Sequence, residues 1–160
     1  MRHRKNTAKL GMKSQHKRAT LANLVCSLIK HKRIRTTVPR AKAARRLADK
    51  MVTLGKAGTL VARRLAAARL SLRGPGPDLD KEARQRWHKS EDILRMLFDE
   101  IAPSFKDRQG GYTRVVRLGA RPGDAAEVAI LEWTSTVVGP VEPEKKNKKA
   151  KEEKTEDKKS

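Results

Sequence analysis

The first 48 residues carry charge of one sign only, and this feature limits the possible folds more than any other. Residues 1–48 contain fifteen Lys or Arg and no Asp or Glu, within a chain whose formal net charge is +21. Residues 49–138 add +4 and residues 139–160 add +2. Like charges at this density repel one another, so they favour a polyanionic partner that releases counterions on binding. A solvated basic surface without a partner is the alternative interpretation.

Composition favours one modest domain with charged ends. The hydrophobic fraction is 37% of 160 residues, which is low for a globular protein but too periodic for a disordered one. We predict a flexible basic arm over residues 1–13, a single domain over residues 14–138 and a disordered charged tail over residues 139–160.

The chain has one cysteine, Cys26, so no intramolecular disulfide is possible and a reducing compartment is favoured. Its N-terminal sequence Met1-Arg2-His3-Arg4-Lys5 is not followed by an apolar segment, and no apolar run has the length of a membrane span. We therefore expect a cytoplasmic protein that does not contact a membrane.

Four segments repeat apolar residues with helical spacing. The predicted helices span residues 14–32, 38–54, 58–72 and 90–102. Ser14, Thr37 and Ser90 are the predicted start signals, whereas Gly55 and Pro103 are predicted to end the second and fourth helices. The residues expected to face the core are Leu21, Leu24, Val25, Leu28 and Ile29, then Ala44, Leu47, Ala48 and Met51, then Val61, Leu65, Ala68 and Leu72, and finally Ile93, Leu94, Leu97, Phe98 and Ile101.

Strand-like patterns occur in three places. A short strand is expected over residues 33–37, and two strands over residues 112–118 and 126–134 are expected to form a C-terminal β-hairpin. The polar segment 74–89 is predicted to be a surface loop that has room for a helical turn. The expected fold class is α+β, a two-layer α/β domain with about four helices packed on a small sheet.

The sequence lacks the residue patterns that catalysis requires. Its four histidines, at positions 3, 16, 31 and 88, have no metal-ligand spacing with one another or with Cys26. The glycine-containing segments 55–58 and 74–77 lack the Lys-Ser/Thr ending of a nucleotide-binding loop. The acids of the predicted hairpin have no base beside them. We expect no enzymatic activity, metal, cofactor or small-molecule substrate.

Folded RNA is the polyanion that these features favour. The chain has only five aromatic residues, too few for a platform on which single-stranded bases stack. No zinc finger or clear helix-turn-helix indicates DNA reading. A DNA-architectural protein remains the second hypothesis, and an RNA-modifying enzyme is the third.

Several motifs are similar, in order and spacing, to one known family. They are Met1-Arg2-His3-Arg4-Lys5, Leu10-Gly11, Ser14-x-His16-Lys17, Leu21-x-Asn23-Leu24, Ser27-Leu28, Thr36-Thr37-x-Pro39-x-Ala41-Lys42, Arg63-Arg64, Leu97-Phe98-x-x-Ile101-Ala102-Pro103, Arg108-x-Gly110-Gly111-Tyr112-Thr113-Arg114 and Gly123-Asp124-x-Ala126. Over about residues 1–134 the chain resembles the family of bacterial large-subunit ribosomal protein seventeen, the L-seventeen family. Residues 74–89 are longer than the usual loop of that family, and Glu127-Val128 stands where Pro-Met is common.

The resemblance implies a function as well as a fold. It implies an α/β two-layer domain that binds large-subunit ribosomal RNA, has no catalysis of its own and lies beside large-subunit ribosomal protein thirty-two. Charge and resemblance together give the residues expected to contact RNA phosphate and sugar. These are Arg2, His3, Arg4, Lys5, Lys9, Lys13, His16, Lys17, Arg18, Arg33, Arg35, Arg40, Lys42, Arg45, Arg46, Arg63, Arg64, Arg108 and Arg114.

Overall fold

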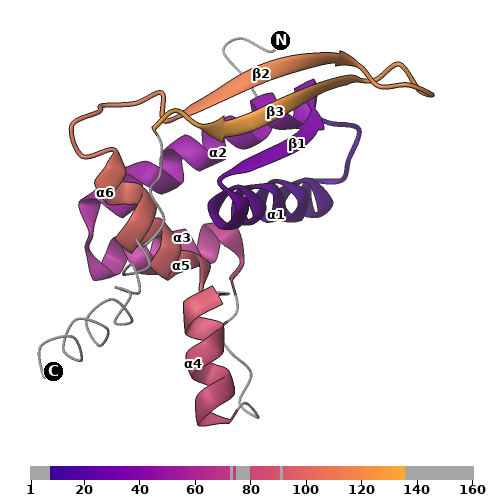
Figure 1. Ribbon diagram of the computed structural model, residues 1–160. Helices are drawn as coiled ribbons and strands as arrows, with labels where there is room; N and C mark the ends of the chain where they lie inside the picture. Colours follow the sequence, from indigo (N-terminus) through magenta and orange to yellow (C-terminus); the bar gives the residue numbers. More distant parts are fainter. Residues whose placement is uncertain (1–7, 73, 75–79, 91, 136–160) are drawn as a thin grey trace, which may run out of the picture.

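The computed structural model describes residues 8–72, 74, 80–90 and 92–135, so the start of the predicted arm and the predicted tail lie outside the described residues. In chain order the elements are α1 (Ser14–His31), β1 (Arg33–Thr37), α2 (Val38–Ala57), α3 (Leu60–Leu70), α4 (Lys81–Ser90), α5 (Ile93–Arg95), the π-helix η1 (Met96–Ile101), α6 (Ala102–Ser104), β2 (Thr113–Ala120) and β3 (Glu127–Trp133). Helices lie on one side of a small sheet, which confirms the predicted α+β class (Figure 1).

The sheet has three antiparallel strands in the order β1-β3-β2. The structure confirms the strand predicted over residues 33–37 and the C-terminal hairpin. Ala129, Leu131 and Trp133 of β3 are buried, because alternate residues of a strand point to the same face and this face packs on the helices. Figure 1 shows the sheet lying across α1 and α2, with no described helix over its other face. The sheet therefore has one buried and one open face.

Aromatic residues close the core at one end of the sheet. The Phe105 ring packs edge-on against Tyr112, with 5.3 Å between the ring centroids, and lies 6.1 Å from the Trp133 ring. Trp133 Nε1 donates a hydrogen bond to the carbonyl oxygen of Leu28 at 3.3 Å. This bond ties the end of β3 to the last turns of α1, whose Leu28 and Ile29 are buried as predicted.

The ends of α1 and α2 differ from the prediction. Lys13 is the N-cap of α1 and Ser14 makes no capping hydrogen bond there. The second helix continues through Gly55, which is buried, and ends at Gly58 with φ of +65°. Gly55 is a packing glycine, because a Cβ added to it would lie 2.8 Å from the Cβ of Ala102. The prediction that Gly55 ends the helix was wrong.

The face that α3 buries also differs from the prediction. Ala62, Ala66 and Leu70 are buried, whereas Val61 is 72% exposed and Leu65 is 39% exposed. Small alanine side chains let α3 lie close to the helices beneath it, and this close packing selects them over larger apolar residues. Of the stripe predicted from Val61, Leu65, Ala68 and Leu72, the first three lie on the surface, whereas Leu72 is half-buried against the core.

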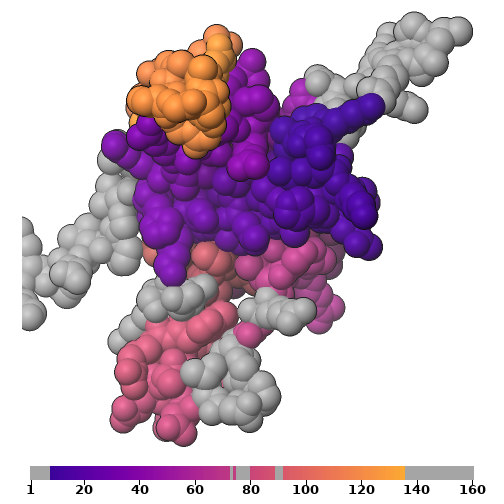
Figure 2. Space-filling view, turned by 90° about the vertical axis from the view of Figure 1, so that its right-hand side faces the viewer, coloured from indigo at the N-terminus to yellow at the C-terminus, as the bar shows by residue number. Residues whose placement is uncertain are grey.

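A helix replaces most of the loop predicted over residues 74–89. Residues 81–90 form α4, and Figure 2 shows this helix, in pink, projecting from the main body. Its residues are mostly polar and include good helix formers, so local propensity supports a helix that the apolar pattern does not reveal. The loop prediction was wrong for this segment.

The last helical segment begins and ends later than predicted. Asp92 caps it, since Asp92 Oδ1 accepts a hydrogen bond from the Arg95 N–H at 3.1 Å, so Ser90 is not the cap. Pro103 lies within α6, and the helix continues to Ser104. The π-helical stretch η1 precedes it, with the Ala102 N–H bonded to the Leu97 carbonyl. A proline near this turn is tolerated because the widened turn rearranges the backbone bonding.

Candidate nucleic-acid interface

Three arginines lie on the open face of the sheet. Arg33 and Arg35 belong to β1 and Arg114 to β2, and all three side chains are exposed. Arg33 lies opposite Glu132 of β3, and Glu132 lies opposite Arg114. Arg35 shares the face of Arg33 because residues two apart on a strand point the same way. We call Arg33, Arg35 and Arg114 the sheet-face arginines.

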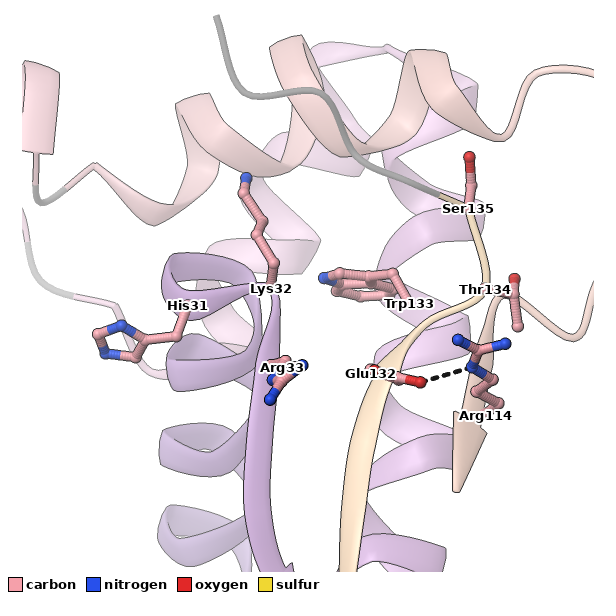
Figure 3. A pocket seen from close by; sticks show the side chains of 8 residues that line it. All are labelled: His31, Lys32, Arg33, Arg114, Glu132, Trp133, Thr134 and Ser135. Atoms are coloured by element: carbon pink, nitrogen blue, oxygen red, sulfur yellow. Dashed lines mark hydrogen bonds and ion pairs between the residues drawn. The ribbon is translucent and has the colours of Figure 1, made fainter. Parts of the chain in front are cut away.

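A carboxylate lies between two of these arginines. Arg114 Nε donates a hydrogen bond to Glu132 Oε1 at 2.6 Å, and 19% of the Glu132 side chain but 61% of the Arg114 side chain is exposed. Figure 3 shows Arg33 on the other side of Glu132, at a pocket of about 270 Å³. The carboxylate holds the Arg114 guanidinium in one position, while the remaining N–H groups of that guanidinium can still bind an anion. One acid between two arginines leaves the local charge positive.

Lys32 borders the same pocket but its charge is balanced within the protein. Its Nζ lies 2.7 Å from Glu100 Oε2, so Lys32 joins the end of α1 to η1. Figure 3 shows the Lys32 side chain directed away from the Arg33, Glu132 and Arg114 row. Arg33 and Arg114 are therefore the arginines that this end of the sheet presents outward.

A second group of basic residues lies on α1 and α2. Arg18, Arg40, Lys42, Arg45 and Arg46 are exposed, and Lys17 is half-buried. Figure 2 shows mainly α1, β1 and α2, in indigo and purple. This part of the chain contains no acid before Asp49. Asp49 Oδ2 lies 3.9 Å from Arg45 Nε. Most of the described cations of residues 1–48 thus lie exposed on α1, β1 and α2.

The predicted residues near the N-terminus are only partly described. Lys9 and Lys13 are exposed before the first residue of α1, and His16 is exposed in its first turn. The remaining predicted residues of the arm, Arg2, His3, Arg4 and Lys5, lie outside the described residues.

The other predicted arginines lie away from the sheet-face row. Arg63 lies over the Phe98 ring at 4.7 Å and 3.6 Å from Asp99, so it already helps to hold α3 against η1. Arg64 is exposed on α3. Arg108 lies in the loop before β2, where its Nε donates a hydrogen bond to the Gly110 carbonyl at 3.1 Å. The structure thus does not gather all predicted cations into a single cluster.

Comparison with known proteins supplies the family. A family model described as ribosomal protein L17 matches residues 20–134. The chain belongs to the ribosomal protein L17 family. Relatives named large ribosomal subunit protein bL17 include one from Methylacidiphilum infernorum, 44% identical over 148 residues, which covers 92% of this chain and 98% of that relative. Another, from Chlamydia felis, is 45% identical over 140 residues, with 83% of this chain and 98% of that relative covered. A third, from Alkaliphilus metalliredigens, is 48% identical over 124 residues, with 78% of this chain and 94% of that relative covered.

Membership of the L17 family makes this chain a structural ribosomal protein and not an enzyme. The match to residues 20–134 includes all three sheet-face arginines. Among the described residues, no three His, Cys, Asp or Glu side chains are grouped so as to hold a metal ion, and no helix is long and apolar enough to cross a membrane. Cys26 is half-buried against the core, and burial raises the pKa of its thiol.

A groove on this L17 domain is lined by two basic residues that the sequence analysis did not assign to the interface. Lys50 and Arg69 line a groove of about 550 Å³ between α1, α2 and α3. The same groove is bordered by the predicted residues Arg18 and Arg46. Lys50 was detectable in principle, because it follows Arg46 by four residues and so shares its helix face. Arg69 was not, because the predicted orientation of α3 was wrong.

The turn between the hairpin strands contains an exposed ion pair. Arg121 Nε donates a hydrogen bond to Asp124 Oδ1 at 2.9 Å, and the two side chains pair through a second nitrogen and oxygen as well. The hydrogen bond from Arg121, followed by one from the Ala126 N–H, lowers the pKa of Asp124 to about 2. Asp124 therefore helps to shape the turn between β2 and β3.

Proposed function

We propose that this protein is a structural constituent of the large ribosomal subunit in the cytoplasm and that it supports translation by binding ribosomal RNA. Its Arg and Lys side chains contact phosphate and sugar. The observation that carries the proposal is the row of sheet-face arginines, of which Arg114 is held by Glu132, on a face that no described helix covers. Arginine binds phosphate through paired N–H donors, so a guanidinium fixed in position loses little entropy on binding.

Charge distribution supports RNA as the partner. The acid-free segment forms α1, β1 and most of α2, and its exposed cations lie on two adjoining surfaces, the open sheet face and the outer sides of the helices. A folded RNA presents phosphates in several directions, so it can contact both surfaces at once. We also propose that neighbouring ribosomal proteins contact the chain, among them large-subunit protein thirty-two.

Sedimentation of cell extracts tests this proposal against the DNA-architectural alternative. A tagged full-length chain should sediment with the large subunit, leave it after RNase treatment and remain on it after DNase treatment. Release by DNase, or sedimentation with the nucleoid, would support the DNA alternative and contradict the proposal.

A further inference from the structure

The helix α3 has an apolar face that the fold leaves on the surface. Val61 is 72% exposed and Leu65 is 39% exposed, and Ala68 is exposed one turn further along. These three residues share a face because they are spaced by four and three positions. The opposite face, formed by Ala62, Ala66 and Leu70, is buried in the core. We call Val61, Leu65 and Ala68 the α3 stripe.

A helix that is apolar on two faces is expected to be covered on both. Isolated apolar residues on a surface are ordinary, but a continuous stripe is typical of a contact site. Within the described residues, the α3 stripe has nothing packed over it, as its exposure shows. The described residues therefore leave the α3 stripe open for a contact.

The α3 stripe leads into the groove of about 550 Å³ between α1, α2 and α3. Ala68 belongs to both the stripe and the groove lining. Leu21 and Leu47, both half-buried, supply further apolar lining. Four basic residues also line the groove, namely Arg18, Arg46, Lys50 and Arg69, and no acid is among the described residues that line it. The surface therefore combines an apolar centre with cations.

We propose that the α3 stripe and this groove form a docking site for an acidic amphipathic helix of a neighbouring protein. Apolar side chains on one face of that helix would contact the stripe and the groove leucines, while its carboxylates would pair with the four cations. The proposal goes beyond RNA binding, because it assigns a protein partner to a surface outside the open sheet face. It gives Arg18 and Arg46, two of the residues predicted to contact RNA, to that protein partner instead.

Other occupants fit these observations less well. An RNA backbone would satisfy the cations, but it would leave Val61 and Leu65 against phosphates and sugars, with no apolar surface to cover them. A second copy of this chain would place four cations against four more, and like charges disfavour that contact. The C-terminal segment 139–160 contains eight Lys and six Asp or Glu, so it lacks the net negative charge that the groove would attract.

A titration of the free full-length chain tests the proposal without depending on ribosome assembly. The probe is a fluorescent helical peptide of about 18 residues, long enough to form helix, with Leu along one face and Glu on the others. The control peptide has the same composition in shuffled order. The amphipathic peptide should bind at least about tenfold more tightly than the shuffled one. Equal affinity for both peptides would overturn the proposal, because it would show attraction to bulk charge alone.

Variants locate the binding surface. Val61→Glu and Leu65→Glu should each weaken peptide binding about tenfold, because each places a carboxylate in an apolar contact. Val116→Glu is the matched control, since Val116 is 42% exposed on the sheet and the charge change is identical. Leu65→Ser separates lost apolar contact from added charge and should also weaken binding. Unchanged thermal midpoints would show that these variants fold. Equal weakening by Val116→Glu, or no effect of the α3 variants, would overturn the proposal.

A photocrosslinking residue at Val61 in the assembled large subunit identifies the natural occupant. An adduct with an acidic amphipathic segment of another protein would support the proposal. An adduct with ribosomal RNA, an adduct with a second copy of this chain, or no adduct would overturn it.

Discussion

The hydroxyl of Thr113 donates a hydrogen bond to Asp49 Oδ1 at 3.0 Å, which joins the first residue of β2 to the middle of α2. Thr113 is only 1% exposed, and Asp49 is the first acid in the chain. The next residue along β2 is Arg114, one of the sheet-face arginines. The first carboxylate of the sequence is thus used inside the protein, to position a strand that presents a cation outward.

This bond predicts a measurable coupling between Asp49 and Thr113. Asp49→Ala leaves the buried hydroxyl without its acceptor, and Thr113→Val removes the donor, so each change should lower the free energy of unfolding by about 1–3 kcal/mol. In a double-mutant cycle the two losses should be less than additive by about 0.5 kcal/mol or more, as expected for residues in contact. Chemical denaturation measures all four free energies, and strictly additive losses would show that the bond does not contribute.

Replacing Gly55 by alanine is expected to create a steric conflict that costs more free energy than the higher helix propensity of alanine contributes. Alanine favours helix over glycine by about 1 kcal/mol, but a Cβ at position 55 would lie 2.8 Å from the Cβ of Ala102. Gly55→Ala should therefore destabilise the protein by about 1–3 kcal/mol, as overpacking does. Adding Ala102→Gly should recover part of this loss by making room for the new methyl group. Denaturation midpoints test both variants, and a stabilised single variant would contradict the close packing of α2 against α6.

The hairpin turn predicts a pH effect confined to Asp124. Its pKa is lowered to about 2, chiefly by the hydrogen bond from Arg121. Because the folded pKa lies below the unfolded value, the contribution of the pair is present above the unfolded pKa and is lost as the pH falls through about 2. Arg121→Ala should raise the pKa of Asp124 toward its ordinary value, although the Ala126 N–H bond should keep it somewhat low. An NMR titration of the carboxyl carbon measures the shift, and an unchanged midpoint in the variant would exclude Arg121 as the cause.

The sequence predicts most of the helices and strands correctly, because local residue patterns determine where these elements form. Alternation around Ile34, followed by Thr37 and Pro39 as a helix start, predicted β1 with its exact bounds. Helical spacing of Val25, Leu28 and Ile29 identified buried positions of α1. Two of the wrong predictions concern positions where packing, and not local pattern, decides the structure. Glycine is typical of a helix end, but Gly55 lies inside α2 and allows Ala102 to pack closely against it. The helix α3 buries its alanines because small side chains permit a short distance between helices.

The candidate interface was predictable in its residues but not in its arrangement. Charge counting alone pointed to Arg33 and Arg35, and the family resemblance added Arg114. Nothing local in the sequence indicates that β1 pairs with β3, which lies about 95 residues further along the chain. Only this pairing, together with that of β2 and β3, places Arg33 and Arg114 on either side of Glu132. From the sequence, Glu132 is only a hairpin acid without a base beside it, and its function of holding Arg114 appears only once the register is known.

The central claim is that the sheet-face arginines contact ribosomal RNA phosphates, and the salt dependence of binding tests it most directly. The full-length chain is titrated with a transcript of large-subunit ribosomal RNA at several salt concentrations. The variant changes all three sheet-face arginines to Gln, and the matched control changes Lys145, Lys146 and Lys148 of the C-terminal segment to Gln, which removes the same charge.

Each lost phosphate contact should reduce the slope of log K against log salt by about 0.7–0.9, so the sheet-face variant should lose about 2–3 in slope. The control variant should keep the slope of the unaltered chain. Equal slopes for the sheet-face variant and the control would contradict the account, because they would show that bulk charge, and not this arrangement of arginines, carries the binding.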